Sequence, residues 1–300
     1  MQSTLMTFNV LNAWTPGSAV YKTMPKRSAD AAVFVKQALP HILCLQEFDY
    51  YYRHDGALLQ EIEERYAEAD TRDEVAGKGW NCIFYRKDLF RELASGENNL
   101  VANGFSIVPI KPTEGETVPP KACNCHKYGY PEDSREGKAG INRTRFRTFA
   151  WAYLERTDGK RLVVATMHFS LRSACQPMEV EFVMERLKEL KQEYGCPILL
   201  CGDFNSHCEW QGSATARLLK DGLLDTFDLA DKRDDRGTCH STSGKGVGEP
   251  DKFPGGAYKS HAIDHILTDT PMTVGEYRIY ATENLLSVSD HCPVEITFDF

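Results

Sequence analysis

The sequence predicts an α/β protein, and three observations support that class. Short apolar runs of strand type alternate with longer segments in which apolar residues recur at helical spacing. The composition, 42% hydrophobic and 26% charged, is ordinary for a globular protein. The alternation continues along the chain without an internal repeat or a linker that would divide it. We therefore expect a single domain over residues 1–300.

The first half of the chain begins with a strand, because Met6, Phe8 and Val10 alternate with polar residues. The segment after it has Pro25 near its first turn and Pro40 just past its end, which predicts a helix. The elements expected in this half are a strand over Met6–Val10, a helix over Pro25–Leu39, a strand over Ile42–Leu45, a helix over Gly56–Ala69, and strands over Trp80–Tyr85 and Leu89–Leu93.

The second half follows a stretch from Lys111 to Gly140 whose prolines, glycines and charges predict a long loop. A second loop of this kind is expected from Ser243 to Ser260. Both loops either determine specificity or are idle surface insertions. The elements expected in this half are strands over Phe149–Leu154 and Leu162–Phe169, a helix over Val180–Tyr194, a strand over Ile198–Cys201, a helix capped by Ser213 that ends at Leu219, and strands over Ala262–Leu267 and Val294–Phe300.

The strand over Ile198–Cys201 ends in a cluster of small and polar residues. Gly202 allows the backbone to turn or another group to approach closely. Asp203 and Asn205 follow two residues apart, so they lie on the same side of an extended chain. A polar turn explains the cluster equally well when it is taken alone. Its interpretation therefore depends on the other strand ends.

Other predicted strands also carry polar residues at their ends, in a fixed order along the chain. They are Thr7-Phe8-Asn9-Val10, Cys44-Leu45-Gln46-Glu47, Thr166-Met167-His168, Ile263-Asp264-His265-Ile266 and Ser289-Asp290-His291-Cys292-Pro293-Val294. Together with the central cluster, this ordered set resembles the endonuclease/exonuclease/phosphatase superfamily, the metal-dependent phosphoesterases related to DNase I. Within it, Cys201–Ser206, the helix after it and Asn81–Asp88 are most similar to the deadenylase and nocturnin-type branch.

The resemblance implies a DNase I-like fold, which is a four-layer α/β sandwich. In it, two mixed β-sheets pack face to face and are flanked by helices on their outer sides. The alternation of strands and helices is compatible with that fold, but it does not distinguish the sandwich from a doubly wound sheet. The site is expected at the edge of the sandwich where the strand ends converge.

The residue types at the strand ends favour a hard divalent cation. Carboxylates with few balancing cations suit Mg²⁺, which is held by one or two carboxylates and keeps waters for a phosphate; Mn²⁺ is the alternative ion. By the resemblance, Glu47 is the main metal ligand, Asp290 is a second, and Asn9 supports the metal or the phosphate. A thiolate zinc site is not expected.

The resemblance also assigns catalytic roles. Asp203 orients or deprotonates the attacking water, and Asn205 holds the phosphate and the developing charge. His291 lies beside the scissile phosphate and is oriented by Asp264. His168 is a second imidazole on the phosphate side, although no acidic partner that would orient it can be identified. Imidazoles donate to phosphate oxygens or move protons near neutral pH.

Two further features are open to more than one interpretation. Arg143, Arg145 and Arg147 recur at period two, so they share a strand face and form either a phosphate-binding strip or a solvated edge. His265 stands where many members of the superfamily have an aromatic residue, so it either lines a pocket or packs in the core.

These observations predict a Mg²⁺-dependent phosphodiesterase, a nuclease that acts on RNA or single-stranded nucleic acid. The alternatives are a phosphatase or a lipid phosphodiesterase, of the inositol phosphate or sphingomyelinase type, and a catalytically inactive binding protein on the same fold. The formal net charge of −8 argues against high-affinity, non-specific binding of duplex DNA. Trp80, Tyr85 and Trp151 are candidates for stacking bases, with core packing as the alternative.

The sequence also suggests where the protein works. No signal peptide and no membrane-spanning run is visible, so we expect a cytoplasmic or nuclear protein. Cys44, Cys82 and Cys201 fall in apolar strands and are not spaced as a disulfide framework, which indicates a reducing compartment. We expect a monomer without an obligate protein partner.

Overall fold

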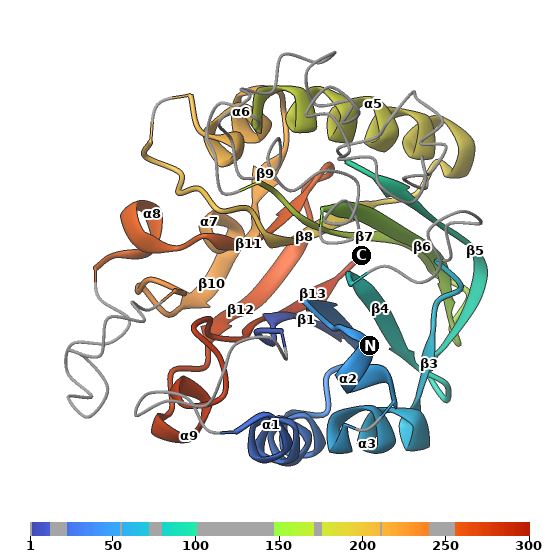
Figure 1. Cartoon of the computed structure of the whole chain (residues 1–300). Coiled ribbons are helices and arrows are strands. Elements are labelled where there is room, and N and C mark those ends of the chain that lie inside the picture. Colours follow the sequence, from blue (N-terminus) through green and yellow to red (C-terminus); the bar gives the residue numbers. More distant parts are fainter. Residues whose placement is uncertain are drawn as a thin grey trace, which may run out of the picture.

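Two mixed β-sheets pack face to face, and helices cover the outer side of each sheet (Figure 1). This arrangement is the predicted four-layer α/β sandwich. The computed structural model describes residues 2–12, 23–54, 56–71, 80–100, 147–170, 176–210, 212–239 and 256–300.

The seven-stranded sheet joins the two ends of the chain, because the first strand pairs with the last. Its members in spatial order are β10 (Ala230–Arg233), β12 (Thr273–Ile279), β13 (Val294–Asp299), β1 (Ser3–Asn9), β2 (Ile42–Gln46), β4 (Cys82–Arg86) and β3 (Tyr66–Glu68). The pairs β1–β2 and β10–β12 are parallel, and the other neighbours are antiparallel.

The six-stranded sheet comes from the middle of the chain. Its members in spatial order are β5 (Phe90–Asn99), β6 (Thr148–Arg156), β7 (Arg161–His168), β8 (Ile198–Asp203), β11 (Asp264–Thr268) and β9 (Leu224–Asp225). Only β7 and β8 run parallel in this sheet.

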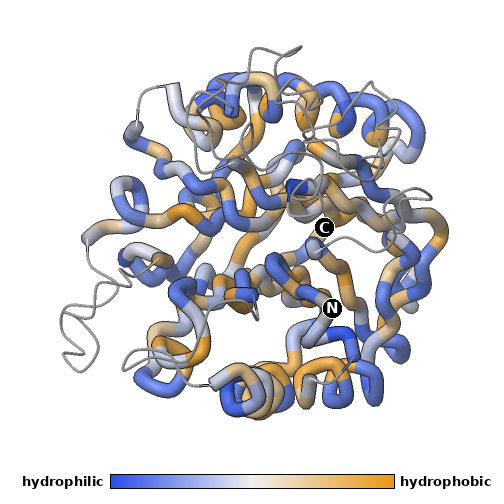
Figure 2. Tube along the Cα trace, in the orientation of Figure 1, coloured by the Kyte–Doolittle hydropathy of each residue, from blue (hydrophilic) through white to orange (hydrophobic). Residues whose placement is uncertain are grey.

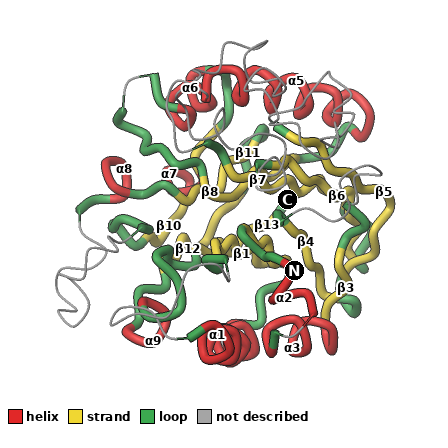
Figure 3. Tube along the Cα trace, in the orientation of Figure 1, coloured by secondary structure: helices red, strands yellow, loops and turns green. Residues whose placement is uncertain are grey.

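The helices form the two outer layers, drawn in red above and below the yellow strands in Figure 3. The seven-stranded sheet is covered by α1 (Met24–Ala38), α2 (Tyr50–His54), α3 (Ala57–Arg65) and α9 (Glu283–Leu286), and the six-stranded sheet by α5 (Gln176–Tyr194) and α6 (Ala214–Lys220). The short helices α7 (Thr226–Leu229) and α8 (Tyr258–His261) lie on the side of β9 and β10. No helix in the described part of the chain has both the length and the apolar character that a membrane span requires.

Three apolar clusters fill the spaces between the four layers, and the strands and inner helix faces are accordingly orange in Figure 2. The central cluster lies between the sheets and includes Cys44 and Cys201, which are buried and free as predicted. One outer cluster packs α1 and α3 on the seven-stranded sheet, and the other packs α5 and α6 on the six-stranded sheet.

Most predicted elements are present, with ends that differ by a few residues. The helix expected over Gly56–Ala69 is wrong at its C-terminal end. It ends at Arg65, because Tyr66 adopts an extended backbone and begins β3, which pairs with β4. The apolar spacing that suggested a longer helix arises because Tyr66 packs into the same outer cluster as the helix.

The strand expected over Leu89–Leu93 is longer than predicted. Strand β5 extends from Phe90 to Asn99 and pairs with β6, so it belongs to the other sheet rather than continuing β4. The loop expected from Ser243 to Ser260 ends earlier, because α8 begins at Tyr258. The rest of that loop up to residue 255, and the whole of Lys111–Gly140, lie outside the described residues.

Candidate active site

The predicted site residues come from strand ends that meet at one edge of the sandwich. Asn9 ends β1 and pairs in register with Gln46, the last residue of β2. In the other sheet, His168, Asp203 and Asp264 are aligned in register across β7, β8 and β11. The two sheets therefore bring to one edge residues that lie far apart in the sequence.

The backbone at this edge adopts conformations that most residues avoid. Glu47 and Asn205 have left-handed φ values of 58° and 49°. Gly202 has φ 136°, and a Cβ added there would lie 2.0 Å from the carbonyl oxygen of Met167 on the neighbouring parallel strand. Glycine is thus required for β7 and β8 to approach, which places His168 beside Asp203.

Asp203 accepts hydrogen bonds from several directions. Its Oδ2 lies 2.9 Å from His168 Nε2 and 3.1 Å from the carboxamide nitrogen of Asn9. Its Oδ1 accepts the backbone N–H of Asn205 at 2.9 Å. Burial alone would raise the pKa of Asp203, but the charges of His168 and His291, the hydrogen bond from His168 and the charge of Arg147 hold it well below its usual value. Asp203 is therefore a carboxylate at any physiological pH.

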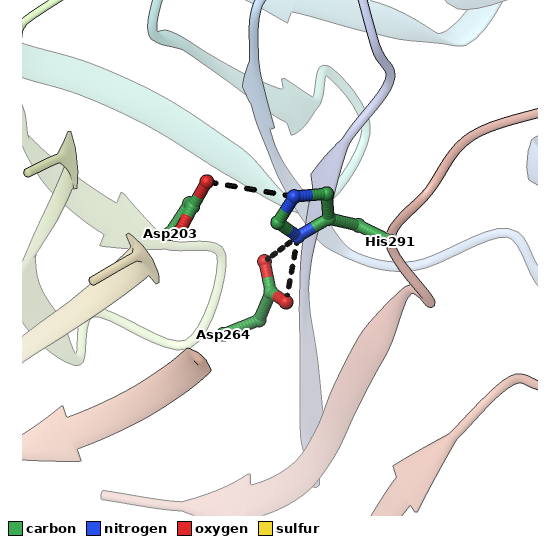
Figure 4. A group of neighbouring side chains, drawn as sticks. All are labelled: Asp203, Asp264 and His291. Carbon is green, nitrogen blue, oxygen red and sulfur yellow. Dashed lines mark hydrogen bonds and ion pairs between the residues drawn. The ribbon is translucent and has the colours of Figure 1, made fainter. Parts of the chain in front are cut away.

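His291 is fixed from one side by a buried carboxylate (Figure 4). Its Nδ1 lies 2.9 Å from Asp264 Oδ2, and that oxygen accepts the hydroxyl of Thr238 at 2.6 Å. Its Nε2 is 3.6 Å from Asp203 Oδ2. Burial alone would lower the pKa of His291, but the charges of Asp264 and Asp203 raise it well above its usual value. The two carboxylates therefore favour the protonated form of this imidazole.

The Glu47 carboxylate lies on the other side of Asp203. Its Oε1 is 3.4 Å from Asn9 Nδ2, and its Oε2 accepts the backbone N–H and the side-chain amide of Asn12. Burial alone would raise the pKa of Glu47, but the charge of His168 and the bonds from Asn12 lower it. The amide nitrogen of Asn9 thus links Glu47 to Asp203, while its oxygen accepts the N–H of Leu11 at 3.0 Å.

Asp290 completes the acidic side of the site. Burial raises its pKa; the charge of His291 opposes the rise and that of Glu47 adds to it. Two carboxylates that repel each other in this way fit a divalent cation, since both are hard oxygen donors. One donor atom each of Asp203, Asp264 and His291 also lie within 4.8 Å of one another, but the imidazole lies between the two carboxylates.

Several supporting residues were not found from the sequence. Glu179 at the start of α5 accepts the N–H and the hydroxyl of Ser170, just past His168. Gln176 donates to the backbone oxygens of Ser170 and Asn205. Both lie just before the helix predicted over Val180–Tyr194, where no local pattern distinguishes them from other polar residues.

The arginine strip is described only in part. Arg143 and Arg145 lie outside the described residues, so their phosphate-binding role stays a prediction. Arg147 is buried just before β6, and its charge lowers the pKa values of Glu47 and Asp203. It is therefore a cation of the site, and the period-two arginine pattern was the signal for it.

Two histidines are placed differently. His265 is fully buried and bonds the hydroxyl of Tyr258 and the backbone oxygen of Ser206, so it packs in the core rather than lining a pocket. His168 is also buried; its Nε2 contacts the Asp203 carboxylate, an acidic partner that the sequence did not reveal, and its Nδ1 has no hydrogen-bond partner among the described residues. Trp151 and Tyr85, two of the stacking candidates, are buried in apolar clusters, whereas Trp80 is partly exposed.

Comparison with known proteins identifies the same scaffold. The model of the Endonuclease/Exonuclease/phosphatase family matches residues 6–291. No curated protein matches the sequence significantly. An endonuclease/exonuclease/phosphatase family protein from Bacteroides thetaiotaomicron is 22% identical, with TM-score 0.68 and coverage of 100% of this chain and 99% of that one.

Two further solved structures have titles that name particular proteins. A mannosyl-6-phosphatase of Bacteroides thetaiotaomicron VPI-5482 is 22% identical, with TM-score 0.66 and coverage of 99% of this chain and 100% of that one. The human nocturnin catalytic domain with bound sulfate is 18% identical, with TM-score 0.64 and coverage of 100% and 94%. At these identities the likeness is one of fold.

Proposed function

The chain belongs to the Endonuclease/Exonuclease/phosphatase family, and from this membership and the site geometry we propose that it is a divalent-metal-dependent phosphoesterase. The observation that carries the proposal is the position of the His291 imidazole, whose Nε2 lies 3.6 Å from Asp203 Oδ2 while its Nδ1 is fixed by Asp264 at 2.9 Å. Such a pair can position a water and protonate an oxygen in one small volume.

We propose that Glu47 and Asp290 bind the cation, because their negative charges repel each other. When bound, Mg²⁺ or Mn²⁺ supplies Lewis-acid stabilisation of the negative charge on a phosphate. Asn9 supports this side of the site by orienting Glu47 relative to Asp203. Mg²⁺ is preferred because the donors are carboxylate oxygens and no thiolate takes part.

The remaining catalytic roles belong to Asp203, His291 and Asn205. Asp203 orients the attacking water by accepting its hydrogen bond, because a carboxylate with so low a pKa is a weak base. His291 donates its Nε2 proton to an oxygen of the phosphate as charge develops there. Asn205, held by its backbone N–H on Asp203 and its side chain on Phe169, is the candidate that binds the phosphate.

We propose RNA or single-stranded nucleic acid as the substrate class, as the strand-end motifs indicate. Arg143 and Arg145 are the candidates that contact the phosphate backbone. His168 stabilises the carboxylate of Asp203 through Nε2, and its Nδ1 remains for a phosphate oxygen. A phosphate monoester of a sugar is the second candidate, and the formal net charge of −8 favours it over a long polyanion.

The test is a hydrolysis panel with and without Mg²⁺. It contains poly(A) RNA, mixed-sequence RNA, single-stranded and duplex DNA, bis-nitrophenyl phosphate, mannose 6-phosphate and inositol phosphates. Asp203→Asn is the inactivating variant, and Asp231→Asn, an exposed acid on β10, is the matched control. Circular dichroism checks that each variant is folded.

The expected result is Mg²⁺-dependent cleavage of RNA that Asp203→Asn loses and Asp231→Asn keeps. Cleavage of monoesters alone would move the protein to the phosphatase alternative with the same site. If the folded wild-type protein hydrolyses no phosphoester in the presence of Mg²⁺, or if Asp203→Asn remains as active as the wild type, the proposal fails.

A further inference from the structure

A cavity of about 450 Å³ lies between helices α1 and α9 and strands β12 and β13, away from the strand ends of the candidate site. Its size is within the range of small-molecule sites, roughly 300–1,000 Å³. No residue of the candidate active site lines it. The lining combines apolar side chains of the two helices with a carboxylate of the sheet, Glu295.

Glu295 points to the helix-covered side of the sheet. Its neighbours Val294 and Ile296 belong to the central cluster between the sheets, so the intervening side chain lies on the opposite face. Only 7% of Glu295 is exposed. Its Oε1 accepts the hydroxyl of Tyr280 at 2.9 Å, whereas its Oε2 is buried and has no hydrogen-bond partner among the described residues.

The cation of the cavity lining, Arg278, is already bound. Arg278 donates to the Glu276 carboxylate at 2.6 Å and to the Tyr280 hydroxyl at 3.2 Å. The other charged residue of the lining is an acid, Asp30 on α1. Leaving a buried carboxylate oxygen without a donor is unfavourable, and more so when the group is charged. A donor that enters the cavity would recover this free energy.

The rest of the lining suits an apolar body. Phe34 and Tyr280 pack edge to face with their ring centroids 5.0 Å apart. Val33 is 54% exposed, although it is a large aliphatic residue beside them. Apolar surface next to a carboxylate that lacks a donor selects a ligand with both characters.

We propose that this cavity binds a small organic cation, a primary ammonium group on an apolar or aromatic body. The ammonium donates to Glu295 Oε2, and the body packs on Val33, Phe34 and Leu285. The inference does not depend on the phosphoesterase proposal, because it uses no residue of that site.

Benzylamine is the probe, and its neutral isostere benzyl alcohol is the matched control. Affinities are measured by titration calorimetry, and the position of binding by the shifts of the Val33 and Leu285 methyl resonances. Glu295→Gln removes the charge and keeps the shape. Glu283→Gln, an exposed acid on the same helix α9 but outside the lining, reports non-specific attraction.

We expect saturable benzylamine binding that shifts both methyl resonances, and roughly tenfold weaker binding to Glu295→Gln, since a charge-assisted hydrogen bond is lost. Glu283→Gln should bind within about twofold of the wild type, and benzyl alcohol should bind more weakly than benzylamine. If Glu295→Gln does not fold, Val33→Arg tests the same point, because it places a competing guanidinium at an exposed position of the lining. Absence of saturable binding, equal binding by benzyl alcohol, or unchanged affinity in both variants overturns the proposal.

Discussion

At the scale of single residues, the site holds its charges by pairing each carboxylate with a donor. Asp203 forms ion pairs with the imidazoles of His168 and His291 and accepts a hydrogen bond from the Asn9 amide. Asp264 forms an ion pair with His291 and accepts a hydrogen bond from the Thr238 hydroxyl. Buried charges are tolerated when they are paired in this way. Burial raises the pKa of both Asp264 and Asp290, and at Asp290 the charge of Glu47 adds to that rise.

Gly202→Ala should destabilise the protein by roughly 3 kcal/mol or more, because the added Cβ would meet the Met167 carbonyl oxygen and the φ of 136° excludes other residues. Urea unfolding measures the change. Gly195→Ala is the control: its φ of 64° is strained, but no atom lies within 4 Å of the added Cβ, so the loss should be about 1 kcal/mol. Equal losses for the two variants would contradict the steric argument.

Glu295→Gln should stabilise the protein at neutral pH by about 1 kcal/mol. Burial raises the pKa of Glu295 above its usual 4.5, so the native state favours the protonated form. The charged carboxylate therefore costs no stability below the unfolded pKa. The cost grows as the pH rises from the unfolded pKa through the folded pKa. Thermal unfolding at pH 8 and near pH 4 measures both limits. A gain that is the same at both pH values would contradict this explanation.

At the scale of elements, helix α1 connects two segments of the site. Arg27 is fully buried in it and donates to the backbone oxygens of Leu11, Asn12 and Val288. The first two oxygens belong to the segment that follows Asn9, and the third precedes Ser289. The first segment carries Asn12, which donates to Glu47, and the second carries Asp290. The helix therefore fixes the distance between these two segments.

Arg27→Met should lower the free energy of unfolding by roughly 3–5 kcal/mol, since it leaves buried backbone oxygens without a donor. Denaturant unfolding gives the value. Lys36→Met on the same helix is the control; its side chain is 57% exposed and pairs with Glu61, so its loss should stay below about 1 kcal/mol. A loss for Arg27→Met as small as that of the control would mean that Arg27 does not hold these segments.

At the scale of the whole molecule, strand ends of both sheets meet at the site, and the three apolar clusters pack the four layers against one another. The carboxylates are therefore fixed at close range by packing far from them. The repulsion between Glu47 and Asp290 opposes stability, and we expect a bound cation to relieve it.

Saturating Mg²⁺ should raise the melting temperature of the wild-type protein, because a ligand of the native state adds about 2.7 kcal/mol at one hundred times its Kd. Asp290→Asn should melt higher than the wild type without metal and gain little from Mg²⁺, since it removes a carboxylate that Glu47 repels. Scanning calorimetry with EDTA and with Mg²⁺ measures both effects. A Mg²⁺ response that persists unchanged in Asp290→Asn would exclude this residue as a ligand.

Local patterns determined the alternation of strands and helices, the Ser213 cap, and the strand-end polar residues of this protein, because each depends on residues close in sequence. The resemblance paired Asp264 with His291, and the structure places His291 Nδ1 2.9 Å from Asp264 Oδ2. The two-sheet architecture was predicted from the order of the motifs. Periodicity could not predict it, because a doubly wound sheet shows the same alternation of strands and helices.

Only the tertiary structure decided which strands pair and which charges meet. The sequence pattern could not assign β4 and β5 to different sheets or end α3 at Arg65, because pairing across sheets leaves no local period. It also missed Arg27, Glu179 and Gln176, whose roles depend on segments brought together by folding. The effects of these three residues depend on their burial and on the distances between charges, and both are properties of the folded molecule alone.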